Sequence, residues 1–139
     1  MAAITLCFGR FRIIHAGHLS IFDQCDDIYI SESSRQTSSL ETAQELGYTS
    51  VYYARTIVQV LNNYSADQEL VLLVGEDRAS MVSLTNSYPN LRVIVIPRNE
   101  YSSTAARATI AGNRSLTESG LAVNDHHADL MIAQYTLEQ

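Results

Sequence analysis

The sequence predicts an α/β fold in which a five-stranded parallel sheet carries helices on both faces. Short apolar runs such as VLLV and VIVI alternate with longer stretches of helical period. The apolar runs are continuous rather than alternating with polar residues, which is typical of strands that are covered on both faces. With 139 residues and no segment that resembles a linker, we expect one domain over residues 1–139.

Each element of this fold follows from a local pattern. The apolar runs predict strands at Ile4–Phe8, Asp27–Ser31, Ser50–Ala54, Leu70–Val74 and Leu91–Ile96. Helices are predicted at Gly17–Gln24, Leu40–Leu46, Thr56–Tyr64, Arg78–Thr85, Thr104–Gly112 and Asp125–Tyr135. The polar run Ser31–Ser39 predicts a mobile surface loop, with a lid as the alternative. The alternation of strand and helix makes the predicted fold Rossmann-like.

Composition excludes several classes of function. All nine basic residues are arginines, so chemistry that needs a lysine amine is excluded. The net charge of −6 argues against binding along a nucleic-acid backbone. Cys7 and Cys25 lie far apart in the sequence without a CxxC motif, and we interpret both as buried thiols in a reducing compartment. The start of the chain lacks a basic n-region and no apolar run is long enough to span a bilayer, so we expect a cytoplasmic protein with no membrane partner.

Ligands of a doubly wound sheet bind beyond the carboxyl ends of its strands, so the residues that follow each strand are the candidates for a site. After the first strand comes Gly9–His18, GRFRIIHAGH, with two histidines three residues apart at a predicted helix start. This spacing lets both imidazoles face one anion, and unpaired amides at the helix start would add to that anion site. An ordinary loop histidine followed by a helix-cap histidine is the alternative interpretation.

A second polar cluster follows the fifth strand. Arg98-Asn99-Glu100 leads into Tyr101–Arg107, YSSTAAR, where hydroxyl residues open a predicted helix and Arg107 lies one turn further on. Helix capping explains the hydroxyl groups. It does not explain why both clusters follow strands whose carboxyl ends share one edge of the sheet.

At these residues the sequence resembles the nucleotidylyltransferase superfamily, whose motifs are HxGH after the first strand and (I/Y)S(S/T/G)TxxR at the start of a late helix. GRFRIIHAGHL is similar to the GRFQPxHxGHL of nicotinamide-mononucleotide adenylyltransferases and their phage-encoded relatives, with Ile13 in place of the usual Pro. YSSTAAR is similar to the YSGTxxR of the same group. A third stretch, LLVGEDR, is similar to their hydrophobic-G-S-D-R segment, with Glu76 in place of Ser.

The resemblance implies transfer of the AMP moiety of ATP to a phosphorylated small-molecule acceptor, with release of pyrophosphate and with Mg²⁺ bound together with the nucleotide. ATP is favoured over CTP because the lysine that cytidylyltransferases place after the HxGH helix is absent. The catalytic residues that the resemblance implies are His15, His18 and Arg107. The nucleotide-binding residues that it implies are Gly9, Arg10, Phe11, Gly17, Gly75, Asp77, Arg78, Ser102, Ser103 and Thr104, and no residue is implied as a direct metal ligand.

The implied roles differ among these residues. His18 would contact the α-phosphate in the transition state, His15 the donor phosphates, and Arg107 the β- and γ-phosphates. Arg12 and Arg78 are further candidates for phosphate or acceptor contacts, with a surface or structural role as the alternative. We interpret Asp77 as a helix N-cap rather than a metal ligand.

The alternative function is a nucleotidyltransferase-like domain that has lost turnover and serves as a binding or assembly module. The resemblance to phage-encoded members extends this alternative to a virion component, located in the host cytoplasm or the virion. The sequence leaves homo-oligomer formation open. His126 and His127 are expected to be exposed or capping residues of the last helix, with an interface or metal role as the alternative.

Overall fold

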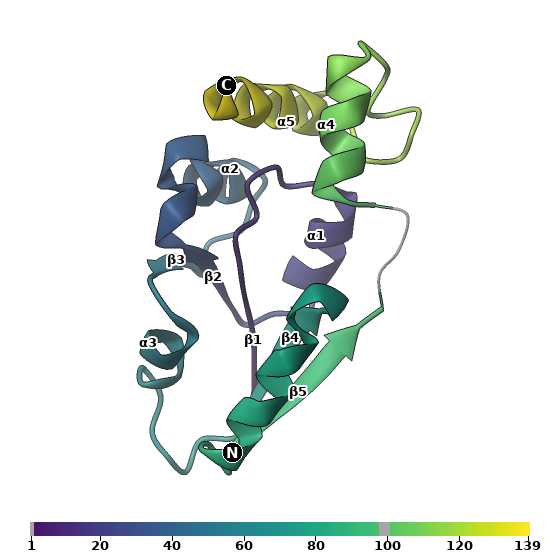
Figure 1. Cartoon of the computed structure of the whole chain (residues 1–139). Coiled ribbons are helices and arrows are strands. Elements are labelled where there is room, and N and C mark those ends of the chain that lie inside the picture. The colour runs from purple at the N-terminus through teal and green to yellow at the C-terminus, as the bar shows by residue number, and fades with distance from the viewer. Residues whose placement is uncertain (1, 98–100) are drawn as a thin grey trace.

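The structure, a computed structural model, describes residues 2–97 and 101–139. The predicted segment Arg98-Asn99-Glu100 lies outside the described residues. A five-stranded parallel sheet has the strand order β3-β2-β1-β4-β5 (Figure 1). Its strands are β1 (Ile4–Gly9), β2 (Asp27–Ser31), β3 (Val51–Ala54), β4 (Leu70–Gly75) and β5 (Leu91–Ile96). The predicted fold class is confirmed, and each predicted strand is present to within one residue at either end.

The helices occupy the connections and the C-terminal part of the chain. They are α1 (Ala16–Phe22), the 3₁₀ helix η1 (Glu32–Thr37), α2 (Ser39–Glu45), α3 (Ile57–Leu61), the 3₁₀ helix η2 (Glu76–Asn86), α4 (Ser103–Ala111) and α5 (Asp125–Glu138). The fourth predicted helix is therefore a 3₁₀ helix, and none of its residues is buried. The backbone angles of Arg78 are not helical, so η2 is interrupted by a kink at this residue, which fits a segment without a continuous apolar stripe.

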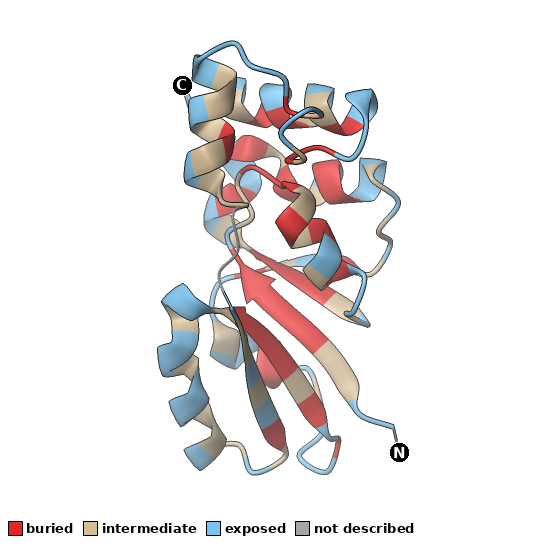
Figure 2. Ribbon diagram, turned by 90° about the vertical axis from the view of Figure 1, so that its right-hand side faces the viewer, coloured by how far each residue is buried: buried red, intermediate tan, exposed pale blue. Residues whose placement is uncertain are grey.

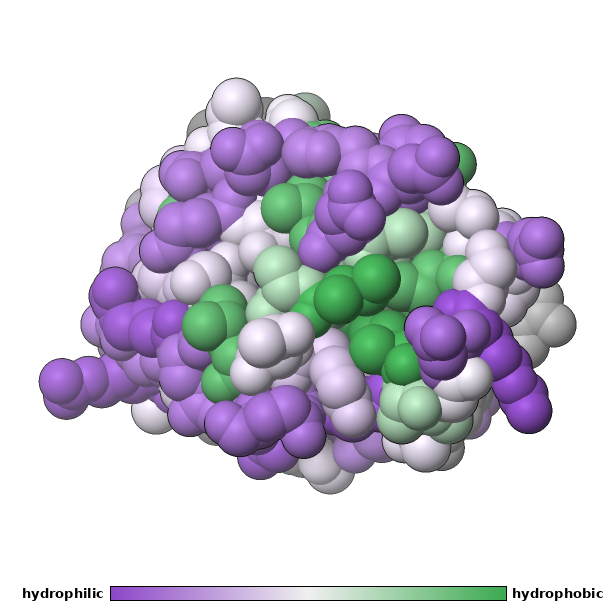
Figure 3. Space-filling model, turned by 90° about the horizontal axis from the view of Figure 1, so that it is seen from above, coloured by the Kyte–Doolittle hydropathy of each residue, from purple (hydrophilic) through white to green (hydrophobic). Residues whose placement is uncertain are grey.

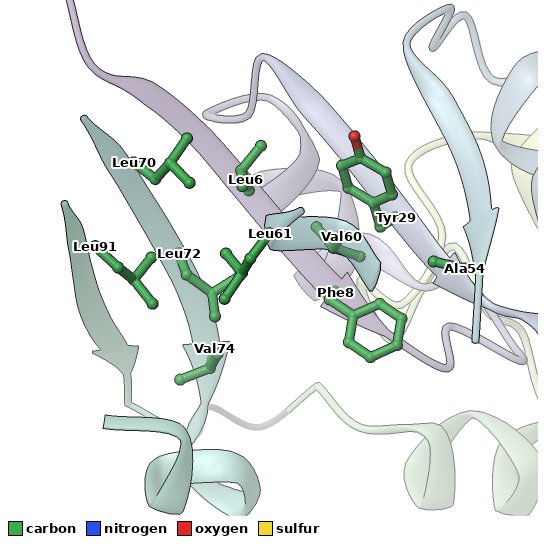
Figure 4. Close-up of a cluster of buried hydrophobic side chains, with 10 residues drawn as sticks. All are labelled: Leu6, Phe8, Tyr29, Ala54, Val60, Leu61, Leu70, Leu72, Val74 and Leu91. Carbon is green, nitrogen blue, oxygen red and sulfur yellow. The ribbon is translucent and has the colours of Figure 1, made fainter. Parts of the chain in front are cut away.

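Alternate residues of the strands build a core on each face of the sheet. On one face, Leu6 and Phe8 of β1 pack with Leu72 of β4 and with Val60 and Leu61 of α3 (Figure 4). On the other face, the intervening residues pack against α1 and α2. That second core comprises Cys7, Ile14, Leu19, Phe22, Ile28, Ile30, Ala43 and Val51. Figure 2 shows that burial is greatest along the central strands and in the helices above them.

A third, smaller core lies beyond the carboxyl ends of the strands. There α4 and α5 pack on each other above the sheet (Figure 1) and bury Ala106 and Met131 together with Ile13 of the β1–α1 connection. Leu116, Leu121 and Ala122 of the connection between α4 and α5 complete this core. Figure 3 shows this end from above, with hydrophobic surface in the middle of a hydrophilic rim. The β1–α1 connection is therefore enclosed between the sheet and a helical cap.

The segment Ser31–Ser39 is not the mobile surface loop that its composition predicts. It forms η1 and the start of α2, and the side chains of Ser34, Thr37 and Ser39 are fully buried. The Thr37 and Ser39 hydroxyls lie 2.8 Å apart in a hydrogen bond. The prediction was wrong because small hydroxyl side chains can be buried when their hydrogen bonds are satisfied, which composition alone does not reveal.

Two further expectations are corrected in detail. Gly75, not Asp77, is the N-cap residue of η2, so Asp77 stands inside the first turn. Cys7 is buried but Cys25 is half-buried, and both are free thiols. A hydrogen bond to Cys25 and burial raise the pKa of Cys7 well above its ordinary value, so the two thiols are neighbours despite their distance in sequence.

Within the described ranges no helix has the length and apolar character needed to cross a membrane.

Candidate nucleotide site at the carboxyl edge of the sheet

The strand order reverses between β1 and β4, and the two cavities of this region lie at their carboxyl ends. The larger cavity has a volume of about 670 Å³ and is lined by residues from the ends of both strands, including Gly9 and Gly75. The smaller has a volume of about 300 Å³ and reaches from His15 to the start of α4. Both cavities share His18, Asp77 and Ser103, so they form the two lobes of one depression.

His15 and His18 are stacked at the start of α1. Their ring centroids are 3.7 Å apart with an interplanar angle of 22°. His15 Nδ1 accepts the Gly17 N–H at 3.1 Å, and His18 Nδ1 accepts the His15 N–H at 3.3 Å. Because Nδ1 is an acceptor in both rings, Nε2 carries the proton in each neutral imidazole. Each ring therefore carries one N–H and no positive charge, and the His18 ring is also hydrogen-bonded to the Ile13 backbone.

Burial keeps these histidines neutral. Burial, assisted by the nearby His127, lowers the pKa of His15 from its ordinary 6.5 to about 4. Burial, followed by the proximity of His15, also lowers the pKa of His18 well below its ordinary value. At pH 7 both rings are thus neutral donors, and a bound anion would favour their protonation.

The helix start itself offers less to an anion than the sequence predicts. We expected unpaired amides there, but the Ala16 N–H donates to the Leu121 carbonyl at 2.8 Å and the Gly17 N–H to His15 Nδ1. The His18 and Leu19 N–H groups both donate to the His15 carbonyl. That expectation was wrong because the histidines cap the helix reciprocally and the segment before α5 takes the remaining donor.

Two buried side chains of α5 hold the residue that precedes the histidine pair. Gln134 Oε1 accepts the Ile14 N–H at 2.9 Å, and His127 Nε2 donates to the Ile14 carbonyl at 2.8 Å. Gln134 Nε2 also donates to the Thr37 carbonyl at 3.2 Å and to Ser39 Oγ at 3.1 Å. Both backbone groups of Ile14 are therefore satisfied by residues more than a hundred positions away.

His127 corrects a further expectation. It accepts the Val123 N–H at 3.0 Å, as a residue that caps the helix would, but its side chain is fully buried rather than exposed. Burial, in spite of its hydrogen bond to the Ile14 carbonyl, lowers the pKa of His127. The adjacent His126 is exposed, as expected, and lies 3.7 Å from Glu45.

Phe11 has a strained backbone in the middle of the motif. Its φ of 47° lies in the left-handed region, which costs a bulky residue about 1–2 kcal/mol. Its ring contacts His18 edge-on at 5.0 Å, and a Cβ on Gly9 would lie 3.0 Å from the Phe11 ring. A Cβ on Gly17 would lie 3.0 Å from the His15 ring. A side chain at either glycine would therefore crowd the neighbouring ring.

The second predicted cluster lies at the start of α4, on the wall of the smaller cavity. Ser102 is the N-cap residue, and its Oγ accepts the Ala105 N–H at 3.0 Å. Ser102, Ser103 and Thr104 line the smaller cavity together with His15 and His18. The two motifs that the sequence singled out thus meet in space.

Arg107 is paired with a carboxylate, whereas the resemblance implies that it contacts the β- and γ-phosphates. Its Nε and Nη2 both donate to the carboxylate of Glu138 at 2.8 Å, at the end of α5. The Arg107 side chain is 37% exposed and that of Glu138 is 14% exposed. Arg107 also lines the larger cavity, so its guanidinium borders the site while it is paired with a carboxylate.

Arginines gather in the larger cavity. Arg10, Arg12, Arg78 and Arg107 line it, and Asp77 is the one acidic side chain among its described lining residues. This concentration of positive charge contrasts with the net charge of −6 of the whole chain. Such a local field favours an anionic ligand.

The structure therefore brings together every site residue that the sequence proposed. It adds Gln134, His127 and Glu138, which the sequence analysis missed as contributors. A separate cavity of about 330 Å³ between β2, β3 and α3 contains none of the proposed site residues. No protein-family model matches the chain, and no curated protein is significantly similar to it.

Proposed function

We propose that this protein is a nucleotidyltransferase that transfers the AMP moiety of ATP to the phosphate of a small-molecule acceptor. The observation that carries the proposal is the stacked pair of neutral histidines between two cavities, one of which gathers four arginines. The resemblance of GRFRIIHAGHL and YSSTAAR to nucleotidylyltransferase motifs supports it independently. The position at the reversal of strand order is where ligands of such sheets bind.

The proposed reaction is an in-line displacement at the α-phosphorus. An oxygen of the acceptor phosphate forms a bond to the α-phosphorus, and the bond to the oxygen that bridges to the β-phosphorus breaks. A phosphate monoester dianion and ATP⁴⁻ give a diphosphate diester dianion and pyrophosphate⁴⁻, so charge and atoms balance without a proton or a redox partner. A residue that acts as a nucleophile is not needed, and catalysis rests on positioning and on charge stabilisation.

The residues present suit those two tasks. The Nε2–H groups of His15 and His18 are donors that burial has already removed from water, so they need little reorganisation when charge develops. The hydroxyl groups of Ser103 and Thr104 offer further donors across the smaller cavity. Arg107 can pair with the terminal phosphates when it exchanges Glu138 for them.

Mg²⁺ fits this site as a companion of the nucleotide. Among residues 2–97 and 101–139 no group of three or more His, Cys, Asp or Glu could hold a metal ion by itself. Asp77 borders both cavities and offers one carboxylate, which together with phosphate oxygens matches the way Mg²⁺ is usually held. Bound there, Mg²⁺ would neutralise phosphate charge during the transfer.

The test is a pyrophosphate-release assay with ATP or CTP against a panel of phosphorylated acceptors, alongside a calorimetric titration of Mg·ATP. We expect His18→Ala to lower kcat roughly 10²–10³-fold while nucleotide affinity changes little, because the donor acts on charge that develops in the transition state. The matched control is His126→Ala, which removes an exposed histidine of the same protein. An equal loss of activity in both variants, or none in His18→Ala, would contradict the assignment.

The second candidate is a binding or assembly module that retains the fold without turnover. The observation that favours it is the bidentate pair between Arg107 and Glu138, which occupies the guanidinium that phosphates would need. Under this hypothesis wild type binds Mg·ATP, no acceptor supports pyrophosphate release, and His18→Ala binds Mg·ATP as the wild type does. The same assay therefore separates the two candidates.

A further inference from the structure

Arg12 carries the one buried side-chain nitrogen or oxygen without a hydrogen-bond partner in the described part of the chain. That atom is its Nε. The three salt bridges among the described residues do not include Arg12. A buried guanidinium N–H without an acceptor is costly, so such a group calls for an explanation, and a bound ion or anionic ligand is one of them. Arg12 lines the larger cavity, while its Nε itself is closed to solvent, so a ligand in that cavity meets the Nε–H once the side chain shifts toward it.

The backbone around Arg12 is fixed rather than free to turn the side chain away. The Arg10 carbonyl accepts a hydrogen bond from the buried hydroxyl of Ser34. The left-handed Phe11 is locked by its ring contacts with His18 and Phe22, at 5.0 and 4.9 Å. Ile13, on the other side, is fully buried in the core of the helical cap. The braced backbone thus holds Arg12 at the wall of the larger cavity.

The two cavities differ in the charge that they offer. The smaller one brings His15 and the hydroxyl residues of α4 to the shared His18, without an arginine among its described lining residues. The larger one brings Arg10, Arg12 and Arg78 to the same histidine, and it also includes Arg107, which the proposed function assigns to the triphosphate. A transfer reaction needs two anionic substrates on either side of the reacting phosphorus, and this division supplies a separate, more positive lobe for the second.

We propose that the part of the larger cavity around Arg12 is the acceptor subsite, and that the Arg12 guanidinium shifts there to offer its unpartnered Nε–H to the phosphate monoester of the acceptor beside His18. This inference rests on the proposed function, and it adds the residue and the lobe that recognise the second substrate. A phosphate dianion suits the site because it offers several acceptor oxygens to neighbouring guanidinium groups. The volume of about 670 Å³ suits a small molecule rather than a macromolecule.

The experiment uses inorganic phosphate as the probe, titrated by calorimetry in a buffer free of phosphate into protein saturated with the α,β-methylene analogue of ATP and Mg²⁺. We expect phosphate to bind to the nucleotide-loaded protein. Arg12→Met retains the aliphatic stem and should weaken phosphate binding roughly tenfold to a hundredfold while leaving Mg·ATP affinity within about twofold. Arg92→Met, which alters an exposed arginine of β5, should change neither affinity.

The other outcomes contradict either the acceptor subsite or the proposed function. Unchanged phosphate binding in Arg12→Met, or exclusion of phosphate by the nucleotide analogue, overturns the acceptor subsite. An equal loss of Mg·ATP and phosphate affinity places Arg12 in the nucleotide lobe and overturns it too. If Arg12→Met does not fold, Arg12→Lys, which keeps the charge but lacks Nε–H, takes its place with the same expectation. If wild type binds phosphate through Arg12 but no nucleotide, the proposed function fails while the anion subsite stands.

Discussion

The two motif segments of the site, Gly9–His18 and Ser102–Arg107, are held in different ways. The first is braced from behind by buried contacts from α5 and η1, which satisfy both backbone groups of Ile14 and the carbonyl of Arg10. The second is anchored in the core by the small side chain of Ala106, and its polar side chains are held by one N-cap hydrogen bond and by the salt bridge from Arg107 to the last turn of α5. The polar contacts of the first segment are buried, whereas those of the second lie at a partly exposed surface.

Under the proposed function, this difference corresponds to a division of work between the two segments. Groups that stabilise a transition state must be held in place before the reaction, and the braced histidine pair meets that condition. Groups that bind and release a substrate can exchange partners, and a guanidinium paired with a carboxylate at the end of a helix can exchange that carboxylate for a phosphate. We therefore expect damage to the braced segment to reduce stability, and damage to the other segment to alter nucleotide affinity.

Lowering the pH should have the largest effect, because it destabilises the first segment, Gly9–His18, through its buried histidine. The pKa of His15 is about 4 in the folded protein against an ordinary 6.5, so the unfolded chain binds the proton more tightly. The stability that neutral His15 contributes is complete above pH 6.5 and is lost as the pH falls toward 4, by about 3 kcal/mol. Urea unfolding at a series of pH values measures this loss.

The matched variant for that titration is His15→Asn, because an asparagine at the N-cap can still accept the Gly17 N–H but does not titrate. Between pH 6.5 and 4 the variant should lose less stability than the wild type by about the same 3 kcal/mol. Parallel pH profiles for the two proteins would show that His15 is not the group that titrates.

Removal of the brace from α5 should have the next largest effect. Gln134→Leu keeps the volume but leaves the buried Ile14 N–H without an acceptor, so we expect a loss of about 2 kcal/mol in the free energy of unfolding. The control is Gln139→Leu, at an exposed position of the same C-terminal segment. Equal stabilities of the two variants would mean that the first segment does not depend on α5.

The contrast between the segments also shows what the sequence could predict. Strands β1 to β5 and the residues after them follow from apolar runs and strand ends, which are local signals. The brace joins Ile14 to Gln134 and Ser34 to Arg10, and no local period reports such pairs. A partial signal exists in α5, where His127, Met131 and Gln134 recur at the spacing of one helix face and are all buried. Two polar residues on this buried face, His127 and Gln134, could have indicated that α5 makes buried polar contacts. They could not have indicated that the partner is the backbone of Ile14.

Arg107→Ala tests the other segment, where binding rather than stability should change. The free protein already pairs this guanidinium with Glu138, so phosphates gain from it only the difference between two anionic partners. We expect Mg·ATP affinity to fall by about 1.5 kcal/mol, or roughly tenfold, with the melting temperature almost unchanged. Calorimetric titration and thermal unfolding measure the two quantities, and a large drop in melting temperature would assign Arg107 to the fold instead.

The smallest effect is expected for Glu138→Gln. This variant tests most directly whether Arg107 exchanges its partner. The carboxylate of Glu138 occupies Arg107 through two hydrogen bonds, so a triphosphate must displace it before the guanidinium becomes available. The amide keeps the shape but removes the charge, which weakens the internal pair and should raise Mg·ATP affinity two- to fivefold, an effect of under about 1 kcal/mol. Glu118→Gln removes the same charge at an exposed position between α4 and α5 and controls for the change in net charge. A rise in affinity in Glu138→Gln alone would show that the second segment exchanges partners. A fall in Glu138→Gln would mean that the carboxylate holds Arg107 in place for the phosphates, and the second segment would then be braced from α5 as the first one is.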